Sequence, residues 1–168
     1  TVFGKREHST FGTIPINGGW EFDIISSGAL RFTVNNIADY TTTWTGVQVS
    51  QFQHVAVTVN GSSMIIYYNG HQIHSDVIAA ITPDNTAFGI GLDCGNGLLN
   101  DLFEGYINEV MFWDIILDST QIQSYMTCPP TGNELGLVGY WDFEEGSGAT
   151  TYDQTSNGND GTLNGGVT

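Results

Sequence analysis

Residues 55–70 decide the fold: they read VAVTVNGSSMIIYYNG. Valine occupies every second position from 55 to 59, which is the two-residue period of a β-strand with one buried face. The strand ends at Asn60-Gly61, a pair that suits the left-handed turn of a tight hairpin. A second apolar run, residues 64–68, follows at once and ends at another Asn-Gly pair. The stretch therefore predicts an antiparallel β-meander.

Similar strand patterns occur on both sides of this hairpin. Trp20, Phe22 and Ile24 share one face of a strand, and Glu21 and Asp23 share the other. The turns between strands are roughly 8–12 residues apart, as in sandwiches and barrels. The further predicted strands cover residues 30–34, 87–92, 105–113 and 137–143.

One helix is predicted, over residues 118–126. Asp118 can accept a hydrogen bond at the helix N-terminus, and Gln121 stands three residues later, where a capping box needs it. Pro129-Pro130 prevents the helix from continuing. One short helix in a chain of strands predicts an all-β fold, a two-sheet antiparallel β-sandwich.

The chain is strongly acidic. Its 168 residues carry 18 acidic and 3 basic side chains, a net charge of −15 with neutral histidines. The basic residues are Lys5, Arg6 and Arg31, and no lysine or arginine follows them. Such a chain repels phosphates and anionic lipids, and it has no apolar run of about 18 residues, so we expect neither a nucleic-acid partner nor membrane insertion. Its carboxylates are expected to be solvated or to bind cations such as calcium.

Two stretches resemble a known family. Residues 51–61 with 66–70 look like the central hairpin of laminin-G-like, concanavalin A-like jelly rolls. Residues 103–113, FEGYINEVMFW, resemble the late strand of that family, usually written F-x-G-x-I-D-E-V. The helix that follows also fits, so the resemblance covers residues 1–126. It implies two antiparallel sheets, one of them concave, and the binding of glycans or proteins, often with calcium.

The closing segment resembles the strand and loop that normally open this family's domain. We therefore expect residues 1–168 to form a single laminin-G-like domain with a body (1–126), a connector (127–136) and a closing segment (137–168). Two arrangements remain open. The closing segment folds back onto the body in place of the opening strand, which we favour, or it begins a further repeat.

A calcium site is predicted in the loop DQTSNGNDG, residues 153–161. Calcium takes six to eight oxygen ligands, which short Asp and Asn side chains and backbone carbonyls supply. The resemblance adds the late strand, where Asn108 stands in a position that is often Asp in the family. The alternative is a polar turn whose side chains bond their own backbone. The predicted ligands are Asp153, Asn157, Asn159, Asp160, Asn108 and Glu109.

The predicted glycan contacts lie in the threonine-rich stretch 39–46, which we expect to be a loop with exposed rings. Sugars stack on aromatic faces, while carboxylates bond their hydroxyls. The predicted contacts are therefore Trp44, Tyr40 and Asp39. The other tryptophans are expected in the core.

An enzyme alternative arises from Glu21-x-Asp23, which is similar to the first part of the E-x-D-x-x-E strand of concanavalin A-like endoglucanases. The third carboxylate is missing, because Ser26 stands there. Retaining hydrolysis requires both a nucleophile and an acid/base. We therefore expect no catalysis, with Glu21 and Asp23 on a solvated sheet face.

Composition and cysteine usage suggest an extracellular protein. Cys94 and Cys128 allow one pairing, and they either form a disulfide or remain two small buried thiols. We expect a non-catalytic, calcium-stabilised module, secreted or at the cell surface, that binds a polysaccharide, another glycan or a protein surface. It would belong to a larger protein with flanking domains. The alternatives are a structural spacer or protein-contact module without glycan affinity and, less favoured, a degenerate glucanase.

Overall fold

The computed structural model of the chain describes residues 3–6, 19–35, 37–81, 87–92 and 102–164. The chain divides into two compact units, Thr1–Glu104 and Gly105–Thr168. Each unit is described by itself below.

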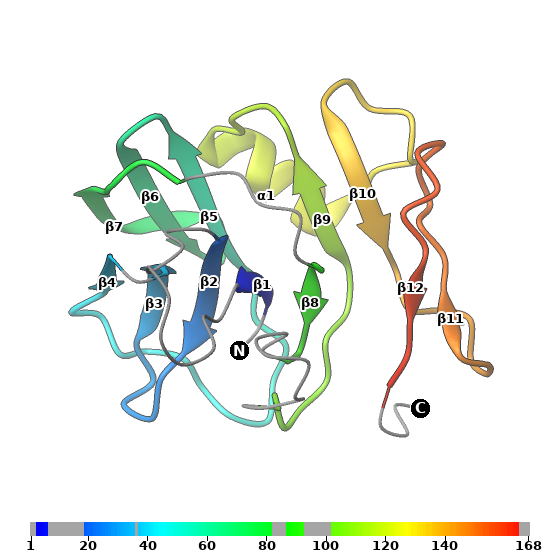
Figure 1. Cartoon of the computed structure of the whole chain (residues 1–168), viewed down its shortest axis with the longest axis horizontal. Helices are drawn as coiled ribbons and strands as arrows, with labels where there is room; N and C mark the ends of the chain where they lie inside the picture. The colour runs from blue at the N-terminus through cyan, green and yellow to red at the C-terminus, as the bar shows by residue number, and fades with distance from the viewer. Residues whose placement is uncertain (1–2, 7–18, 36, 82–86, 93–101, 165–168) are drawn as a thin grey trace, which may run out of the picture. The chain divides into compact units, whose positions relative to one another are not determined.

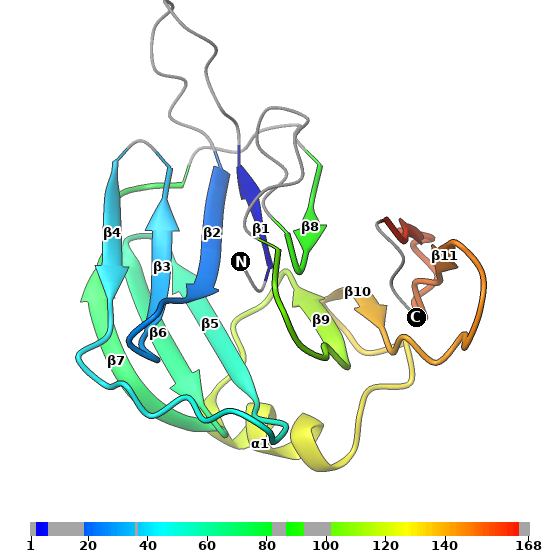
Figure 2. The ribbon, with the colours of Figure 1, turned by 90° about the horizontal axis from the view of Figure 1, so that it is seen from below.

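The first unit holds two antiparallel sheets, which form two layers (Figures 1 and 2). The five-stranded sheet has the order β4-β3-β2-β1-β8, and the three-stranded sheet has the order β5-β6-β7. The strands of the five-stranded sheet are β1 (Phe3–Arg6), β2 (Gly19–Ile24), β3 (Leu30–Val34), β4 (Ala38–Thr41) and β8 (Gly89–Ile90). Those of the three-stranded sheet are β5 (Val55–Asn60), β6 (Ser63–Tyr68) and β7 (His71–Val77).

The core of this unit lies between the two layers. Alternate residues of β2, β3 and β6 supply its fully buried side chains, as the two-residue period predicts. Each such side chain contributes about 1.5–3 kcal/mol to folding. The buried cluster consists of Phe22, Leu30, Phe32, Val34, Met64, Ile66 and Ile78.

The central hairpin is confirmed. β5 pairs with β6 from Val55↔Tyr68 to Asn60↔Ser63. Gly61 adopts φ +59°, the left-handed conformation that the tight turn needs. The all-β, two-sheet antiparallel sandwich predicted from this stretch is therefore correct for the first unit.

The described part of the second unit, residues 105–164, contains four strands and the helix. β9 (Val110–Trp113) pairs antiparallel with β10 (Leu137–Trp141), and β11 (Thr150–Thr151) pairs with β12 (Gly161–Thr162). The closing segment thus places a strand beside the predicted late strand. The assignment of residues 1–168 to one laminin-G-like domain stays a prediction.

The helix α1 (Ser119–Thr127) begins as predicted. Asp118 Oδ1 accepts a hydrogen bond from the Gln121 backbone N–H at 2.9 Å, and Gln121 Oε1 accepts one from the Asp118 N–H at 2.9 Å. This reciprocal capping box satisfies two donors that the helix itself leaves free. No helix among the described residues is long and apolar enough to span a membrane.

Several predicted boundaries are wrong. The strand predicted over residues 105–113 begins only at Val110, because Glu109 has φ +58° and interrupts the extended backbone. The strand predicted over 137–143 ends at Trp141, and Phe143 has φ +56°. Positive φ at residues other than glycine leaves no clear mark in a sequence.

Candidate functional site

The three predicted glycan contacts do not form one site. Asp39 and Tyr40 lie on β4 and not in a loop, so they point to opposite faces of the sheet. Tyr40 is half-buried against the core, and its hydroxyl accepts a hydrogen bond from the Ala79 N–H at 2.9 Å. The prediction of an exposed ring is therefore wrong for Tyr40, whose role here is packing.

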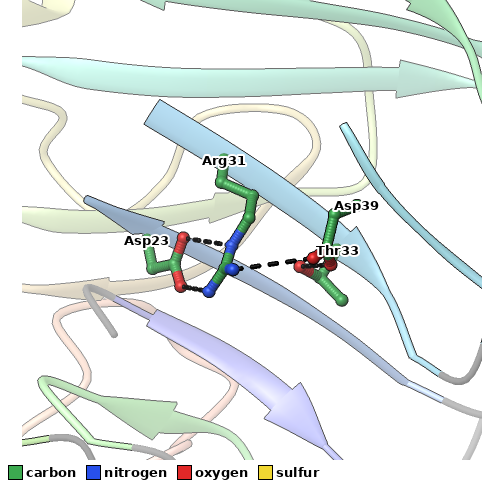
Figure 3. A network of polar contacts seen from close by, with 4 residues as sticks. All are labelled: Asp23, Arg31, Thr33 and Asp39. Atoms are coloured by element: carbon green, nitrogen blue, oxygen red, sulfur yellow. Dashed lines mark hydrogen bonds and ion pairs between the residues drawn. The ribbon is translucent and has the colours of Figure 1, made fainter. Parts of the chain in front are cut away.

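Asp39 belongs to a polar network on the five-stranded sheet (Figure 3). Its Oδ1 accepts a hydrogen bond from Thr33 Oγ1 at 2.7 Å, and its Oδ2 lies 3.6 Å from Arg31 Nη1. Arg31 also donates from Nε to Asp23 Oδ1 at 3.1 Å and forms an ion pair with Oδ2 of the same residue. The hydrogen bond to Asp23 raises the pKa of Arg31, against the opposing effect of burial. We call these four residues the Arg31 network.

The carboxylates of the glucanase-like pattern are not solvated as expected. Glu21 and Asp23 are only 5 % and 6 % exposed. They lie two residues apart on one strand face, as in a glycosidase, but Arg31 holds Asp23 through both carboxylate oxygens. A glycosidase needs one carboxylic acid and one free carboxylate at the sugar. Asp23 is therefore held in an ion pair and does not fit either role.

Trp44 follows β4 of the five-stranded sheet, and its ring packs on Tyr68 of the three-stranded sheet. Thr42 anchors the segment: its Oγ1 accepts from the Leu30 N–H on β3 at 3.2 Å and donates to the Trp44 carbonyl at 2.7 Å. The half-buried indole lies 4.2 Å from the ring of Tyr68 on β6, at an interplanar angle of 47°. A Cβ at Gly46 would lie 2.3 Å from Trp44 Cζ2, so the ring position requires glycine there.

The stretch after Trp44, residues 48–53, forms a loop held by its own glutamines. Gln53 Oε1 accepts hydrogen bonds from the Gln48 N–H at 2.8 Å and from the Tyr68 hydroxyl at 2.5 Å. Gln53 Nε2 donates to the carbonyls of Gln48 and Gln51. Ser50 in the middle has φ +69°, which is uncommon for a residue with a side chain. The hydrogen bonds of Gln53, including the one from Tyr68, thus hold residues 48–53 beside the Trp44–Tyr68 pair. We call residues 48–53 the glutamine loop.

The outer polar groups of the loop are exposed and are not used by the fold. Gln51 Nε2 donates to Gln48 Oε1. Within the part of the chain that the structure describes, no hydrogen bond is recorded for Gln48 Nε2 or Gln51 Oε1, a donor and an acceptor. Phe52 and Val49 are 74 % and 89 % exposed. We define the Trp44 site as Trp44, Tyr68 and the glutamine loop.

Sequence reasoning found only Trp44 of this site. The sequence predicts Tyr68 only as part of the hairpin and predicts no binding role for the glutamines. A signal was present, because three glutamines and a phenylalanine follow Trp44 within ten residues, in the stretch QVSQFQ. Amide side chains beside aromatic rings are typical of sugar-binding surfaces.

The predicted calcium loop is organised around one carboxylate. Asp153 is buried, and its Oδ1 accepts hydrogen bonds from the N–H groups of Tyr140 at 3.0 Å and Thr155 at 2.9 Å. Its Oδ2 accepts from Thr155 Oγ1 at 2.8 Å and from Asn159, through the backbone N–H at 2.9 Å and Nδ2 at 3.1 Å. An ionised carboxylate offers about four lone-pair sites, so protein donors occupy them all. Asp153 therefore does not fit the role of a calcium ligand in this arrangement.

The other predicted ligands in the loop also bond the protein. Asn157 Nδ2 and Asn159 Nδ2 donate to the Val138 carbonyl at 3.0 and 2.9 Å, and Asp160 Oδ1 accepts from the Asp153 N–H at 3.0 Å. These bonds tie the loop to β10, as the polar-turn alternative requires. Burial raises the pKa of Asp153, but hydrogen bonds from Thr155, Tyr140 and Asn159 outweigh it and leave that pKa below its ordinary value.

The late-strand residues do not join this loop through any recorded bond. Asn108 is exposed, and Glu109 is half-buried just before β9. Burial raises the pKa of Tyr140 to about 12, and the negative charges of Glu109 and Asp142 add to this effect. Among the residues that the structure describes, no group of three His, Cys, Asp or Glu side chains is arranged to hold a metal ion. Calcium binding stays a prediction.

The predicted disulfide between Cys94 and Cys128 is also untested. Cys94 lies outside the described residues, whereas Cys128 is exposed at the end of α1. The alternative of two buried thiols is therefore wrong for Cys128, and a disulfide stays a prediction.

Comparisons with known proteins agree with this fold. The chain is similar in structure to a Bacteroides ovatus protein that is proposed to bind carbohydrate, with a TM-score of 0.66 and 22 % sequence identity. The match covers 82 % of this chain but only 43 % of that protein, so the chain spans less than half its length. In sequence searches no curated protein matches significantly. The laminin G model of the concanavalin A-like lectin/glucanases superfamily matches residues 4–123, and the chain therefore belongs to that superfamily.

Proposed function

We propose that the chain is a carbohydrate-binding module and that the Trp44 site holds the sugar. The observation that carries this proposal is the half-buried Trp44–Tyr68 pair, with centroids 4.2 Å apart, beside a glutamine loop with unused amide groups. Pyranose rings present apolar C–H faces that pack on aromatic rings, and their hydroxyls both donate and accept hydrogen bonds. The superfamily and the Bacteroides ovatus protein that is proposed to bind carbohydrate support the same function.

The geometry favours binding without a large rearrangement. Gly46 accommodates the indole, Thr42 anchors its backbone, and Tyr68 bonds Gln53. A site whose side chains are already ordered loses less conformational entropy when it takes up a ligand. This favours recognition over catalysis, as does the ion pair that holds Asp23. We further propose a non-catalytic role outside the cell, as a part of a larger protein.

The test is a glycan array probed with the purified chain and with two matched variants. Phe52→Ala removes an exposed ring from the Trp44 site, whereas Tyr106→Ala removes a similarly exposed ring from the second unit. We expect the wild type and Tyr106→Ala to bind the same glycans, and Phe52→Ala to bind them more weakly. Equal loss in both variants would contradict the location of the site. No binding by the wild type would favour the spacer function instead.

A further inference from the structure

We propose that the Trp44 site takes uncharged glycans, chains of hexoses that carry only hydroxyl groups, and rejects sulfated and uronic-acid glycans. This inference rests on the proposed function and adds the chemical class of its ligand. It is carried by the charges and the free hydrogen-bonding groups around the site.

The first argument is that the segments forming the Trp44 site carry no cation to meet an anionic sugar. No lysine or arginine follows Arg31 in the sequence, so none occurs in residues 44–53 or at Tyr68. Arg31 itself is engaged by Asp23 and Asp39 in the Arg31 network. Proteins bind sulfate and carboxylate groups through arginine or lysine, because desolvating an unpaired anion is costly. A sulfated chain would gain no such partner from the segments that form the site.

The second argument is the field of the whole chain. A net charge of −15 creates a negative potential that repels anions before they reach contact. This repulsion extends about one Debye length, which is about 8 Å at physiological ionic strength. An uncharged glycan does not experience it, so its binding is expected to be nearly independent of salt.

The third argument is the chemistry of the unused amides. Gln48 Nε2 is a donor and Gln51 Oε1 is an acceptor. A hydroxyl group satisfies both kinds of partner, because it donates and accepts. A sulfate or carboxylate group only accepts, so where it replaces a hydroxyl opposite Gln51 Oε1 that acceptor is left without a hydrogen bond, which is unfavourable.

Titration calorimetry on the purified chain tests this inference. The uncharged probes are cellohexaose, laminarihexaose, xylohexaose and mannohexaose, and the anionic probes are a heparin hexasaccharide and hexagalacturonate. Every titration contains EDTA, so that no divalent ion bridges carboxylates and sugar, and is run at low and at high NaCl. We expect at least one uncharged probe to bind with an affinity that changes less than about twofold with salt. We expect neither anionic probe to bind.

The outcomes separate the two proposals. Binding of an anionic probe that high salt abolishes would overturn the uncharged class and leave carbohydrate binding in place. Binding of no probe, with a glycan array that is also blank, would overturn both proposals.

A conservative variant tests the role of the amides. Gln48→Glu keeps an oxygen that accepts from Gln51 Nε2, but it replaces the free donor by a charge. We expect the affinity for the uncharged probe to fall about tenfold, which is about 1.4 kcal/mol. Gln123→Glu, the same change on α1, is the matched control and should bind like the wild type. Unchanged binding by Gln48→Glu would show that the free amide groups do not contribute to glycan binding.

An independent observation carries a second inference, on the loop of residues 153–160. We infer that hydrogen bonds within the protein, and not a calcium ion, hold this loop on β10. Calcium requires six to eight oxygens at about 2.3–2.6 Å, with their lone pairs directed at the ion. Here N–H and O–H groups of Tyr140, Thr155 and Asn159 direct their hydrogens at both oxygens of Asp153. The positive ends of those bonds occupy the place that an ion would take.

Thermal unfolding in EDTA and in calcium chloride, each with NaCl added to equal ionic strength, tests the second inference. The variant Asp160→Asn alters the loop, and Asp114→Asn changes an exposed aspartate outside it. We expect the three proteins to respond to calcium alike, whether that response is zero or comes from a site elsewhere. Stabilisation of the wild type and of Asp114→Asn by calcium that is lost in Asp160→Asn would overturn the inference.

Discussion

At the scale of single residues, Gly46 is the position on which the Trp44 site depends most directly. Because a Cβ there would lie 2.3 Å from Trp44 Cζ2, alanine must displace the indole or the backbone. We expect Gly46→Ala to lower the free energy of unfolding by about 1–3 kcal/mol, the usual cost of overpacking. Tryptophan fluorescence should shift and glycan binding should weaken. Thr45→Ala, an exposed change in the same segment, should alter neither, and a wild-type fluorescence spectrum for Gly46→Ala would contradict this geometry.

Asp153 gives a prediction of pH dependence. Its pKa in the folded protein lies below the ordinary 3.8, so the stability it supplies is fully present above about pH 4 and is lost as the pH falls through the folded pKa. Asp153→Asn should lower the free energy of unfolding at pH 7 by about 2–3 kcal/mol, because several bonds to a charged acceptor are lost. Urea unfolding at pH 7 and at pH 3 measures this. The difference between wild type and variant should narrow at pH 3, and a constant difference would contradict the role of the charge.

The burial and the partners of single residues could not all be predicted from the sequence. The alternation of β2 correctly predicted that Glu21 and Asp23 share a face, because that follows from local geometry. It did not predict that they are buried, since Arg31 lies opposite Asp23 only through the register of β2 and β3. The partner of a charged residue is a property of the pairing between strands and not of either strand alone.

At the scale of elements, those with their signals inside one short stretch were predicted well. The hairpin β5–β6 has its turn and both strands within residues 55–68, and the ends of α1 are set by a cap and two prolines. Strands that are interrupted by a non-glycine residue with positive φ were predicted too long. β9 is the example, because Glu109 in the left-handed region cannot be recognised from its residue type.

Variants of the capping box of α1 test how much the cap contributes to the stability of the helix. Asp118→Ala removes the acceptor for the Gln121 N–H, and we expect the free energy of unfolding to fall by about 1 kcal/mol. Asp118→Ser keeps a side-chain acceptor at the cap and should recover most of that loss. Chemical denaturation of the three proteins checks this, and an equal loss in both variants would show that the hydrogen bond is not what stabilises the helix.

At the scale of the whole molecule, the pairing of Trp44 with Tyr68 could not be predicted from the sequence because the two residues come from distant segments. Trp44 follows the edge strand β4, whereas Tyr68 ends the central strand β6 of the other sheet. Their contact depends on how the two sheets pack, which no local pattern encodes. The same packing gives Tyr40 and Trp44 different partners although they are near neighbours in the chain: Tyr40 packs on the core and bonds Ala79, whereas Trp44 packs on Tyr68.

The net charge of −15 leads to the last prediction. Like charges are closer together in the folded protein than in the expanded unfolded chain, so their repulsion favours unfolding. Raising NaCl from about 10 to about 150 mM shortens the Debye length from about 30 to about 8 Å and screens that repulsion. The melting temperature should therefore rise with NaCl. The Arg31 network opposes this trend, because salt also weakens its ion pairs. The network contains only one arginine, however, whereas the chain carries a large excess of carboxylates, so we expect the repulsion to dominate. Arg31→Gln should consequently steepen the rise. A melting temperature that falls with added salt in the wild type would mean that attraction within such pairs, and not repulsion across the surface, dominates the electrostatic free energy of this chain.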